Sequence, residues 1–183
     1  MIISINGLSG CGKSSVGRML AQKLGYKFYS AGDYRRLMAR DMGLNIEELN
    51  KLGEKESFTD KKAEEWQTQL GLKENNFVIT TRLSFMTLPQ SIKVLLKVDP
   101  HIGTQRVFND KEDPLRINQK NAHTLKEQEK YNAERDNSDV LRYKKWYDVD
   151  ITDPKHYDII IDTTNINIEQ VVEKILEFIH NHS

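Results

Sequence analysis

Residues 7–15, GLSGCGKSS, constrain the fold of this chain more than any other stretch of its sequence. They follow the mostly apolar run 2–5 and precede residues 13–24, where apolar side chains recur three and four positions apart. This spacing predicts one face of a helix, and Gly25 stands where a helix is expected to end. The sequence therefore predicts a strand, a glycine-rich loop and a helix in direct succession. An ordinary tight turn is the simplest interpretation of the loop, but its residue types favour a phosphate site.

The loop has the spacing G-x-x-x-x-G-K-[S/T] from Gly7 to Ser14, in the strand–loop–helix context that this motif requires. Residues without a Cβ allow backbone N–H groups to turn inward and form a nest for anions, and the helix N-terminus adds free N–H groups and a favourable dipole. Lys13 would place a positive charge against the β- and γ-phosphates of a nucleotide, and the Ser14 hydroxyl can bind Mg²⁺. The predicted nucleotide-binding residues are Gly7, Leu8, Ser9, Gly10, Cys11, Gly12, Lys13, Ser14 and Ser15.

Composition limits the class of protein. The 183 residues suit one compact domain that can bury an adequate core. Lys plus Arg and Asp plus Glu both number 27, so no global charge favours nucleic acid or an acidic membrane surface. A single Cys excludes an internal disulfide framework and suits a reducing compartment, and neither a basic leader nor an apolar run of about 20 residues is present. We therefore expect a soluble, cytoplasmic monomer with small-molecule partners and no nucleic-acid or membrane partner.

Short β-like runs alternate with helical patterns along the chain. Strands are expected at residues 2–5, 27–29, 77–80, 92–98 and 157–162. Helices are expected at residues 13–24, 31–42, 46–53, 60–70, 100–109 and 124–147, and a last one follows Asn167, the predicted N-cap, with an apolar stripe to Ile179. The alternation predicts an α/β fold in three layers, with a parallel sheet of about five strands and helices on both faces. Ligands of such sheets bind beyond the carboxyl ends of the strands, where the glycine loop also lies.

Two segments depart from this alternation and are expected to stand off the sheet. Residues 31–76 carry three helical patterns in a row without a strand, which is too much for one crossover. Residues 111–150 are rich in Lys, Arg, Glu and Asn and have few large aliphatic residues, so we expect them to bury little surface. Elements of this kind can close over a substrate. The alternative for the second segment is a solvated, charged helix without function.

A glycine loop indicates a nucleotide but not a reaction, because motors, GTPases, ABC proteins and small-molecule kinases all carry one. A chain of 183 residues with two helical inserts leaves little room for a motor. GTPases would be expected to show an Asn-Lys-x-Asp motif for the base, and the sequence contains none. These exclusions favour a phosphotransferase with a second site for an acceptor.

Three segments resemble nucleoside monophosphate kinases. SAGDYRR, residues 30–36, resembles their Ser-x-Gly-Asp/Glu-x-x-Arg segment, and VITTRLSF, residues 78–85, stands where they end a strand with a Gly-Arg pair. RDNSDVLR, residues 135–142, has the spacing Arg-Asp-x-x-Asp-x-x-Arg, which resembles the lid segment of cytidylate kinases. The glycine loop, the segment LNKLGE and the closing YDIIIDTT are also similar to compact archaeal-type cytidylate kinases. The chain is therefore identified as a member of that branch of the P-loop nucleoside monophosphate kinases.

The resemblance implies a P-loop nucleoside kinase fold and a reaction. The fold would form a single domain, residues 1–183, with an acceptor-binding helical insert at about 31–76 and a lid at about 106–147. The phosphoryl donor would be ATP, acting with Mg²⁺, and the acceptor would be CMP, together with dCMP. Both nucleotides are small-molecule partners.

The resemblance also implies roles for individual residues. Asp33 would hold waters around Mg²⁺ beside Ser14, Arg142 would read the base, and Asp139 would bind the ribose hydroxyls. The expected acceptor-binding residues are Asp33, Arg36, Arg82, Arg135, Asp139 and Arg142, and the expected cations at the reacting phosphates are Lys13, Arg36, Arg82, Arg106, Arg135 and Arg142. Arg35 adjoins this set but is predicted to lie on the surface. The alternative for residues 135–142 is i,i+3 and i,i+4 ion pairing along an exposed helix.

Three positions depart from the family pattern. Thr80 stands where an acidic residue is usual, and Thr81 replaces the glycine before Arg82. In the helix after KVDPHIG, Asp110 occupies the position of a second arginine, for which Lys111 or Arg116 would have to compensate. These departures keep two other functions open. One is a kinase of UMP, AMP or another small acceptor, and the other is a kinase-like switch protein that binds nucleotide without turnover.

Overall fold

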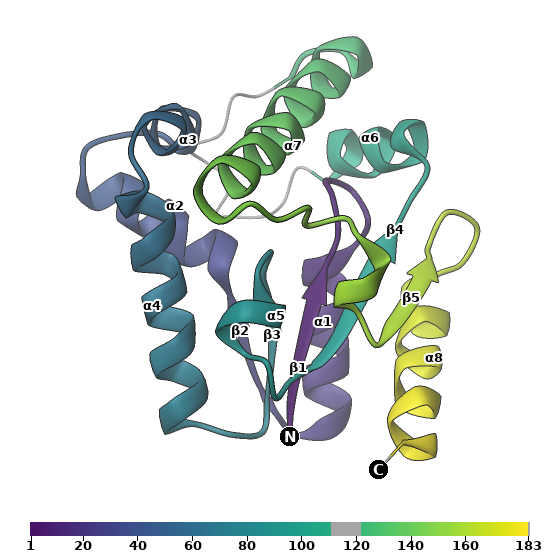
Figure 1. Ribbon diagram of the computed structural model, residues 1–183. Helices are drawn as coiled ribbons and strands as arrows, with labels where there is room; N and C mark the ends of the chain where they lie inside the picture. The colour runs from purple at the N-terminus through teal and green to yellow at the C-terminus, as the bar shows by residue number, and fades with distance from the viewer. Residues whose placement is uncertain (111–121, 183) are drawn as a thin grey trace.

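A five-stranded sheet forms the centre of the protein (Figure 1). The computed structural model describes residues 1–110 and 122–182. The strands follow the spatial order β2–β3–β1–β4–β5, and every neighbouring pair is parallel. Their bounds are β1 Ile2–Asn6, β2 Lys27–Ser30, β3 Phe77–Thr80, β4 Ile92–Lys97 and β5 Ile159–Asp162. The predicted α/β fold with a parallel sheet is confirmed.

Helices cover both faces and the carboxyl edge of the sheet. They are α1 Lys13–Leu24, α2 Ala31–Asp41, α3 Ile46–Lys55, α4 Phe58–Lys73, α5 Ser84–Thr87, α6 Pro100–Asn109, α7 Leu125–Tyr147, the 3₁₀ helix η2 Pro154–His156, and α8 Ile168–Asn181. The sequence predicts neither α5 nor η2, because elements of 4 and 3 residues are too short to show a helical period. Within the described part of the chain, no helix has the length and apolar composition needed to cross a bilayer.

The main apolar core lies between the sheet and the helices α1 and α8. Ile3 and Ile5 of β1 are fully buried there, and so are Val172 and Ile175 of α8. The apolar stripe predicted for the last helix is therefore the face that packs on the sheet. Asn167 caps α8 as predicted, within a capping box. This core holds β1, and with it the start of the glycine loop, at the centre of the sheet.

A smaller core lies on the other face of the sheet. Leu70 of α4 packs there with Phe77 and Ile79 of β3, and Leu88 closes the cluster. The expectation that residues 31–76 stand off the sheet is therefore wrong for α4, whose apolar end is needed to cover β3. α2 and α3 rise from this base toward the carboxyl edge of the sheet (Figure 1).

α7 lies above the carboxyl edge of the sheet and contacts both α3 and α6 (Figure 1). Its second half buries Ser138, Asp139, Arg142 and Tyr143. The expectation that residues 111–150 bury little surface is wrong for this half, because charged groups with partners are buried in place of aliphatic ones. Residues 111–121 of the predicted lid, with Lys111 and Arg116, lie outside the described residues.

Candidate active site

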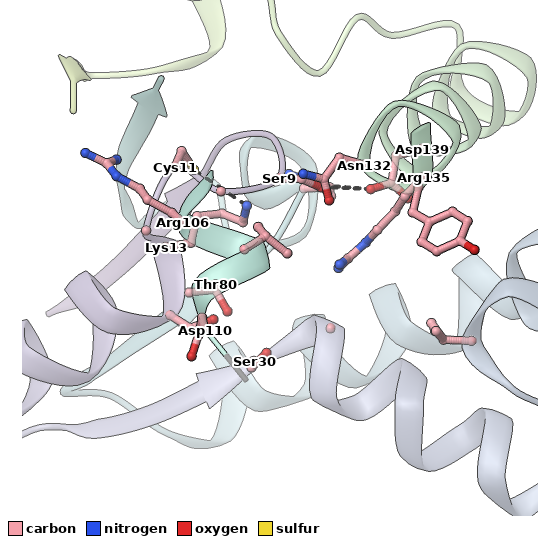
Figure 2. Close-up of a pocket in the computed structure, with 18 of the residues that line it drawn as sticks. Ser9, Cys11, Lys13, Ser30, Thr80, Arg106, Asp110, Asn132, Arg135 and Asp139 are labelled. Carbon is pink, nitrogen blue, oxygen red and sulfur yellow. Dashed lines mark hydrogen bonds and ion pairs between the residues drawn. The ribbon is translucent and has the colours of Figure 1, made fainter. Parts of the chain in front are cut away.

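A cavity of about 1520 Å³ opens at the carboxyl edge of the sheet, where the glycine loop follows β1 (Figure 2). Its walls come from the loop, the ends of β2 and β3, the helices α3, α6 and α7, and the segment after β5. A cavity therefore lies where the topology of the sheet predicts a ligand site. Sites for one small ligand are typically about 300–1,000 Å³, so this one has room for two ligands.

The glycines of the loop occupy backbone conformations and contacts that side chains would prevent. Gly7 has φ +144° and Gly10 has φ +79°. A Cβ on Gly10 would lie 2.2 Å from the carbonyl oxygen of Gly103, so this glycine lets the loop lie directly against α6. Cys11 is buried in the main core at 1% exposure, whereas Leu8 points outward. The loop is thus fixed from below by the core and from the side by α6.

The N-terminus of α1 presents backbone N–H groups to the cavity. The first backbone bond of the helix runs from Val16 to the carbonyl of Gly12, at 2.9 Å. The amides of Lys13, Ser14 and Ser15 precede this bond, so they have no partner within the helix. The Gly12 N-cap supplies no side-chain acceptor for these amides, and all four residues line the cavity. This end of α1 has the geometry of an anion site.

The Lys13 ammonium lies over the loop. Its Nζ donates to the carbonyl of Leu8 at 2.7 Å. Burial lowers the pKa of Lys13 to about 8, and the guanidiniums of Arg82 and Arg135 contribute to this shift. Because burial and the nearby guanidiniums both disfavour the charge of Lys13, a bound anion would favour its charged form.

Arg82 lies at the end of β3, and two carboxylates hold it in place. Its Nε donates to Asp139 at 3.0 Å, and its Nη2 lies 2.9 Å from Asp139 and 3.6 Å from Asp136. Its Nη1 is buried and has no hydrogen-bond partner among the described residues. A buried, unpartnered guanidinium nitrogen costs free energy, and an anionic ligand in the cavity would remove that cost.

Arg135 projects from α7 into the cavity (Figure 2). It forms no hydrogen bond or ion pair with any residue of the described ranges. Burial lowers its pKa to about 10, and the nearby Arg36 and Arg82 also disfavour its charge. Arg36, whose Nη1 donates to Asp33 at 2.7 Å, lines the same cavity. The structure therefore brings three of the predicted guanidiniums, those of Arg36, Arg82 and Arg135, to one cavity.

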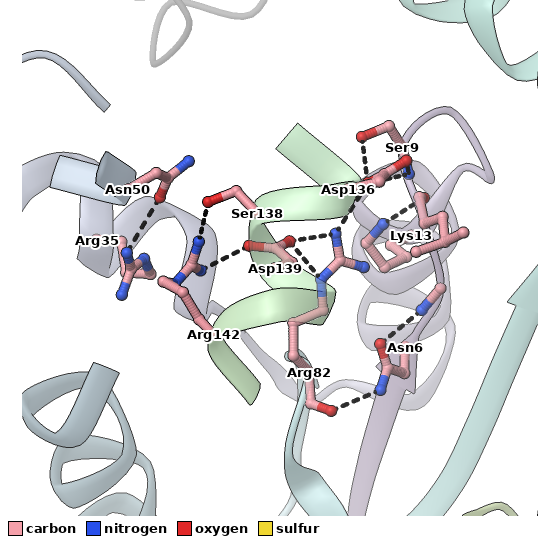
Figure 3. Close-up of polar contacts among 12 residues, drawn as sticks. Asn6, Ser9, Lys13, Arg35, Asn50, Arg82, Asp136, Ser138, Asp139 and Arg142 are labelled. Atoms are coloured by element: carbon pink, nitrogen blue, oxygen red, sulfur yellow. Dashed lines mark hydrogen bonds and ion pairs between the residues drawn. The ribbon is translucent and has the colours of Figure 1, made fainter. Parts of the chain in front are cut away.

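Arg142 and Asp139 line the cavity from α7, but both are part of a buried network (Figure 3). Arg142 is 1% exposed. Its Nε donates to Asp60 at 2.9 Å, its Nη1 to Ser138 at 2.8 Å and its Nη2 to Asp139 at 2.6 Å. The i,i+3 ion pair of the alternative interpretation is thus present, but it lies on a buried face of the helix, not on an exposed one.

The segment LNKLGE provides space for this network. A Cβ on Gly53 of α3 would lie 2.9 Å from Cδ of Arg142, so only glycine lets the arginine pass. The indole Nε1 of Trp146 donates to the carbonyl of Gly53 at 2.8 Å, and Ser138 donates to Glu54 at 2.6 Å. These contacts fix α7 against α3. The neighbouring guanidiniums hold the pKa of Asp139 well below its usual range despite burial, so its carboxylate stays charged.

The prediction that Arg35 lies on the surface is wrong. It is 7% exposed, and its guanidinium donates to Asp60 at 2.6 Å and to Asn50 at 3.1 Å. The helical position of Arg35 points away from the sheet, but α3 and α4 pack on that side of α2 and supply partners for the charge. Asp60 therefore joins Arg35 of α2 to Arg142 of α7.

Arg106 lies on the opposite side of the cavity from Arg135 (Figure 2). Its Nη1 donates to the Thr163 hydroxyl at 3.0 Å, and its Nη2 donates to the Thr163 and Thr164 carbonyls at 2.7 and 3.3 Å. These partners follow β5 and are all uncharged. The structure therefore places this predicted cation on the loop side of the cavity, apart from the cluster of three guanidiniums.

Oxygen ligands for a magnesium ion are available on the loop side. Ser14 and Thr80 both line the cavity with hydroxyl groups, and Thr80 is the last residue of β3. Asp33 accepts from Arg36 at 2.7 Å and is not among the described residues that line the cavity. Among the described residues, no cluster of three or more His, Cys, Asp or Glu could hold a metal ion. The donor set fits a Mg²⁺ ion that keeps phosphate oxygens and water as most of its ligands.

Two further departures from the family pattern are Thr81 after β3 and Asp110 after α6, and the fold accommodates Thr81 without strain. Thr81 is buried, and its hydroxyl donates to Gln67 of α4. Positive φ values among the described non-glycine residues occur at Asn76 and Asp148, so a glycine is not required at position 81. Asp110 lines the cavity at the end of α6.

Sequence reasoning gave no role to Asp60 or Asp136. Asp60 is 1% exposed and lies between Arg35 and Arg142. Asp136 accepts hydrogen bonds from Ser9 of the glycine loop. The only signal for Asp136 is its place in the Arg-Asp-x-x-Asp-x-x-Arg spacing, which does not indicate a partner 127 residues away.

The sequence was compared with family models and with curated proteins of known function. The model of the cytidylate kinase-like family matches residues 2–165. The cytidylate kinase of Methanocella arvoryzae is 31% identical over 179 residues, which cover 98% of this chain and 97% of that protein. The cytidylate kinase of Archaeoglobus fulgidus is 32% identical over 178 residues, covering 97% of this chain and 93% of that protein.

A solved structure shares the fold. The shikimate kinase from Acinetobacter baumannii, determined in complex with shikimate, matches with a TM-score of 0.58 and 21% identity, covering 100% of this chain and 94% of that one. At this identity the likeness shows the fold alone, and it confirms the predicted P-loop kinase fold.

Proposed function

Because the chain belongs to the cytidylate kinase-like family, we propose that it transfers the γ-phosphoryl group of ATP to CMP, and also to dCMP. The products would be ADP and the cytidine diphosphate. The proposed enzyme is a single domain, in which residues 31–76 bind the acceptor and residues 106–147 form the lid. The coarser activity, that of a nucleoside monophosphate kinase, follows from the family itself.

One observation carries this proposal: guanidinium nitrogens without a hydrogen-bond partner in the described part of the chain lie at the same cavity as a loop with the geometry of an anion site. Nη1 of Arg82 is buried and has no hydrogen-bond partner among the described residues, and Arg135 forms no hydrogen bond or ion pair with any of them. Two anions that are to react need cations between them, because their mutual repulsion opposes the approach. The arrangement suits the transfer of a phosphoryl group between two phosphates.

In the proposed reaction, an oxygen of the acceptor phosphate attacks the γ-phosphorus, and the bond to the β–γ bridging oxygen breaks as ADP leaves. No protein nucleophile is needed. The glycine loop, residues 7–15, would hold the donor phosphates through its backbone N–H groups and Lys13, and Arg106 would lie on the same side. Bound Mg²⁺, held by Ser14 and through water by Asp33, would neutralise charge on the β- and γ-phosphates.

The acceptor half of the proposed site is built from α2, β3 and α7. Arg36 and Arg82 would grip the acceptor phosphate, because planar guanidinium groups can bind its oxygens bidentately. Arg135, whose charge interacts with Lys13 of the loop and with Arg36 and Arg82, would stabilise charge on the transferred group. An arginine in that role can contribute roughly 10³–10⁵ in rate.

The base would be read next to Asp139 and Arg142. Cytosine offers N3 and O2 as acceptors and its N4 amino group as a donor, so it needs donors beside an acceptor. Asp139 would bind the ribose hydroxyls. Arg142 already spends its Nε and one N–H of each terminal nitrogen on Asp60, Ser138 and Asp139. We therefore propose that it contributes to base selection through its remaining N–H groups and by fixing those partners.

An ADP-release assay with ATP, Mg²⁺ and a panel of CMP, dCMP, UMP and AMP tests this function. We expect CMP and dCMP to be the preferred acceptors. Arg135→Ala should lose about 10³-fold or more of the turnover, whereas Arg40→Ala, which removes an arginine with 65% exposure from α2, should not. Preferred turnover of UMP or AMP would overturn the choice of base. Tight ATP binding without turnover of any acceptor would favour the switch protein that Thr80 and Asp110 leave open.

A further inference from the structure

We propose that Asp136 is a positioning residue that ties the glycine loop to the acceptor arginines, so that the donor and acceptor phosphates are held in one arrangement. The inference rests on the proposed function. It concerns a carboxylate that would touch neither nucleotide base and would act through Ser9 and Arg82. Its basis is a set of contacts between segments that lie far apart in the sequence.

The first contact joins Asp136 to the loop (Figure 3). The backbone N–H of Ser9 donates to Oδ1 and Oδ2 of Asp136 at 3.2 and 3.1 Å, and the Ser9 hydroxyl donates to Oδ1 at 2.8 Å. A carboxylate that accepts from both an amide and a hydroxyl forms charge-assisted hydrogen bonds, which are stronger than neutral ones. Helix α7 is thereby attached to the third residue of the loop.

The second contact joins Asp136 to the acceptor side. Its Oδ1 lies 3.6 Å from Nη2 of Arg82, and Asp139, one helical turn further along α7, holds Nε and Nη2 of the same guanidinium. The two carboxylates flank Arg82 and leave its Nη1 without a partner among the described residues. Asp136 therefore helps to orient the nitrogen that would bind the acceptor phosphate.

These two contacts have a consequence for Arg135, the neighbour of Asp136 in the sequence. Together with the contacts of Ser138 and Trp146 to α3, the attachment of Asp136 to the loop fixes the rotation of α7 about its axis. Successive residues of a helix point about 100° apart, so a fixed Asp136 directs the side chain of Arg135. Arg135 faces the cavity and lacks any hydrogen bond or ion pair in the described ranges that would hold it there. The placement of the Arg135 side chain thus depends on how Asp136 and the rest of α7 are held.

Asp136 is the acid of α7 that contacts both the glycine loop and Arg82. Its side chain is 18% exposed and is surrounded by Ser9, Arg82 and Lys13. Glu129, two turns earlier on the same helix, is exposed to solvent. A change of Glu129 to Gln removes the same charge from α7 without touching the loop, so it is the matched control.

The test compares Asp136→Asn, Asp136→Glu and Glu129→Gln in steady-state kinetics with ATP and CMP. Misplacement of a positioned group by about 1 Å can cost 10²-fold in rate. We expect Asp136→Asn to lower kcat by about this factor and to change the KM of ATP less than threefold. Asp136→Glu, which restores the charge, should recover part of kcat, and Glu129→Gln should match the wild type. An unchanged kcat in Asp136→Asn, or an equal loss in Glu129→Gln, would overturn the proposal.

A second measurement does not depend on the reaction. Hydrogen exchange of a peptide covering residues 7–15 reports the amide of Ser9. We expect faster exchange in Asp136→Asn than in the wild type and no change in Glu129→Gln. If the wild type phosphorylates no acceptor, the proposed function fails, yet faster exchange still supports the tie between loop and helix. If turnover is normal and exchange is the same in all variants, the proposed function stands and the role of Asp136 is overturned.

Discussion

Below the glycine loop, the sheet packs on α1 and α8 through side chains such as Ile3, Leu20 and Ile175, all of them fully buried and apolar. Above the loop, α7 contacts α3 and α4 through polar and charged groups, and Asp60 of α4 links it to α2. There, Arg35 contacts Asp60, which contacts Arg142. From Arg142 the chain of ion pairs continues through Asp139 and Arg82 to Asp136 (Figure 3). One end of the protein is held by aliphatic surface, and the other combines two small apolar clusters, around Leu49 and around Tyr143, with paired charges.

The difference follows from what each end has to do. Burial of apolar surface is not directional and contributes about 25 cal/mol per Å² without fixing any single group. Buried charges lose their hydration and stay charged only with well-placed partners. A cavity for phosphates needs guanidiniums held in fixed positions, and carboxylates such as Asp139 supply this. The lower region thus provides stability without fixing any single group. The upper region also fixes the orientation of the guanidiniums at the cavity.

The largest effect that separates the two regions should come from Lys13→Ala. Loss of one preorganised donor costs about 10²–10³-fold in kcat, or ~3–4 kcal/mol, so we expect turnover near the lower end of detection. The melting temperature should not fall, because burial already disfavours the Lys13 charge in the free protein. Turnover and thermal unfolding of the same preparation check both statements, and near-normal turnover would contradict the role of the loop.

Arg142→Ala should disturb both stability and function. It removes the partner that Asp60 and Asp139 share, but Arg35 still pairs with Asp60 and Arg82 with Asp139. A buried charge left without any partner typically costs about 3–5 kcal/mol, so we expect a loss no larger than this. Denaturant unfolding measures this loss. In the fraction that stays folded, we expect the ratio of CMP to UMP turnover to fall. An unchanged ratio would remove Arg142 from base selection and leave it a structural role only.

Leu20→Ala is the counterpart in the apolar core. Leu20 of α1 is fully buried among aliphatic side chains, and Leu→Ala changes at such sites cost about 2–5 kcal/mol. We expect the free energy of unfolding to fall while kcat and KM stay within twofold of the wild type below the melting transition. A large change in kcat would mean that the core also orients the site, and the distinction between the two regions would not hold.

The smallest effect should be a pH dependence of stability in the upper region. Glu64 of α4 accepts from Tyr147 of α7, and burial raises its pKa from 4.5 to about 7. A folded-state pKa above the unfolded value means that the stabilisation is fully present below pH 4.5 and is lost as the pH rises through about 7. We expect on the order of 1–2 kcal/mol. Unfolding titrations from pH 5 to 8 should show this slope in the wild type and not in Glu64→Gln.

The same contrast explains how far the sequence could predict the structure. The bounds of α1 and α6, the cap at Asn167 and the phosphate loop follow from local spacing, and the structure has them where the spacing puts them. The partners of buried charges are not local. Asp60 and Arg142 are 82 residues apart, and Ser9 and Asp136 are 127 apart. No period in the sequence indicates such pairs, which is why Arg35 is predicted on the surface and the roles of Asp60 and Asp136 are missed.

The central claim is that the loop and the arginines form one cavity that holds two anionic ligands face to face. Calorimetric titration with a ligand that joins adenosine and cytidine through five phosphates tests it most directly. We predict one molecule bound per chain, at least about 10²-fold more tightly than ATP or CMP alone, and loss of this gain in Arg135→Ala. An affinity no higher than that of ATP would contradict the claim.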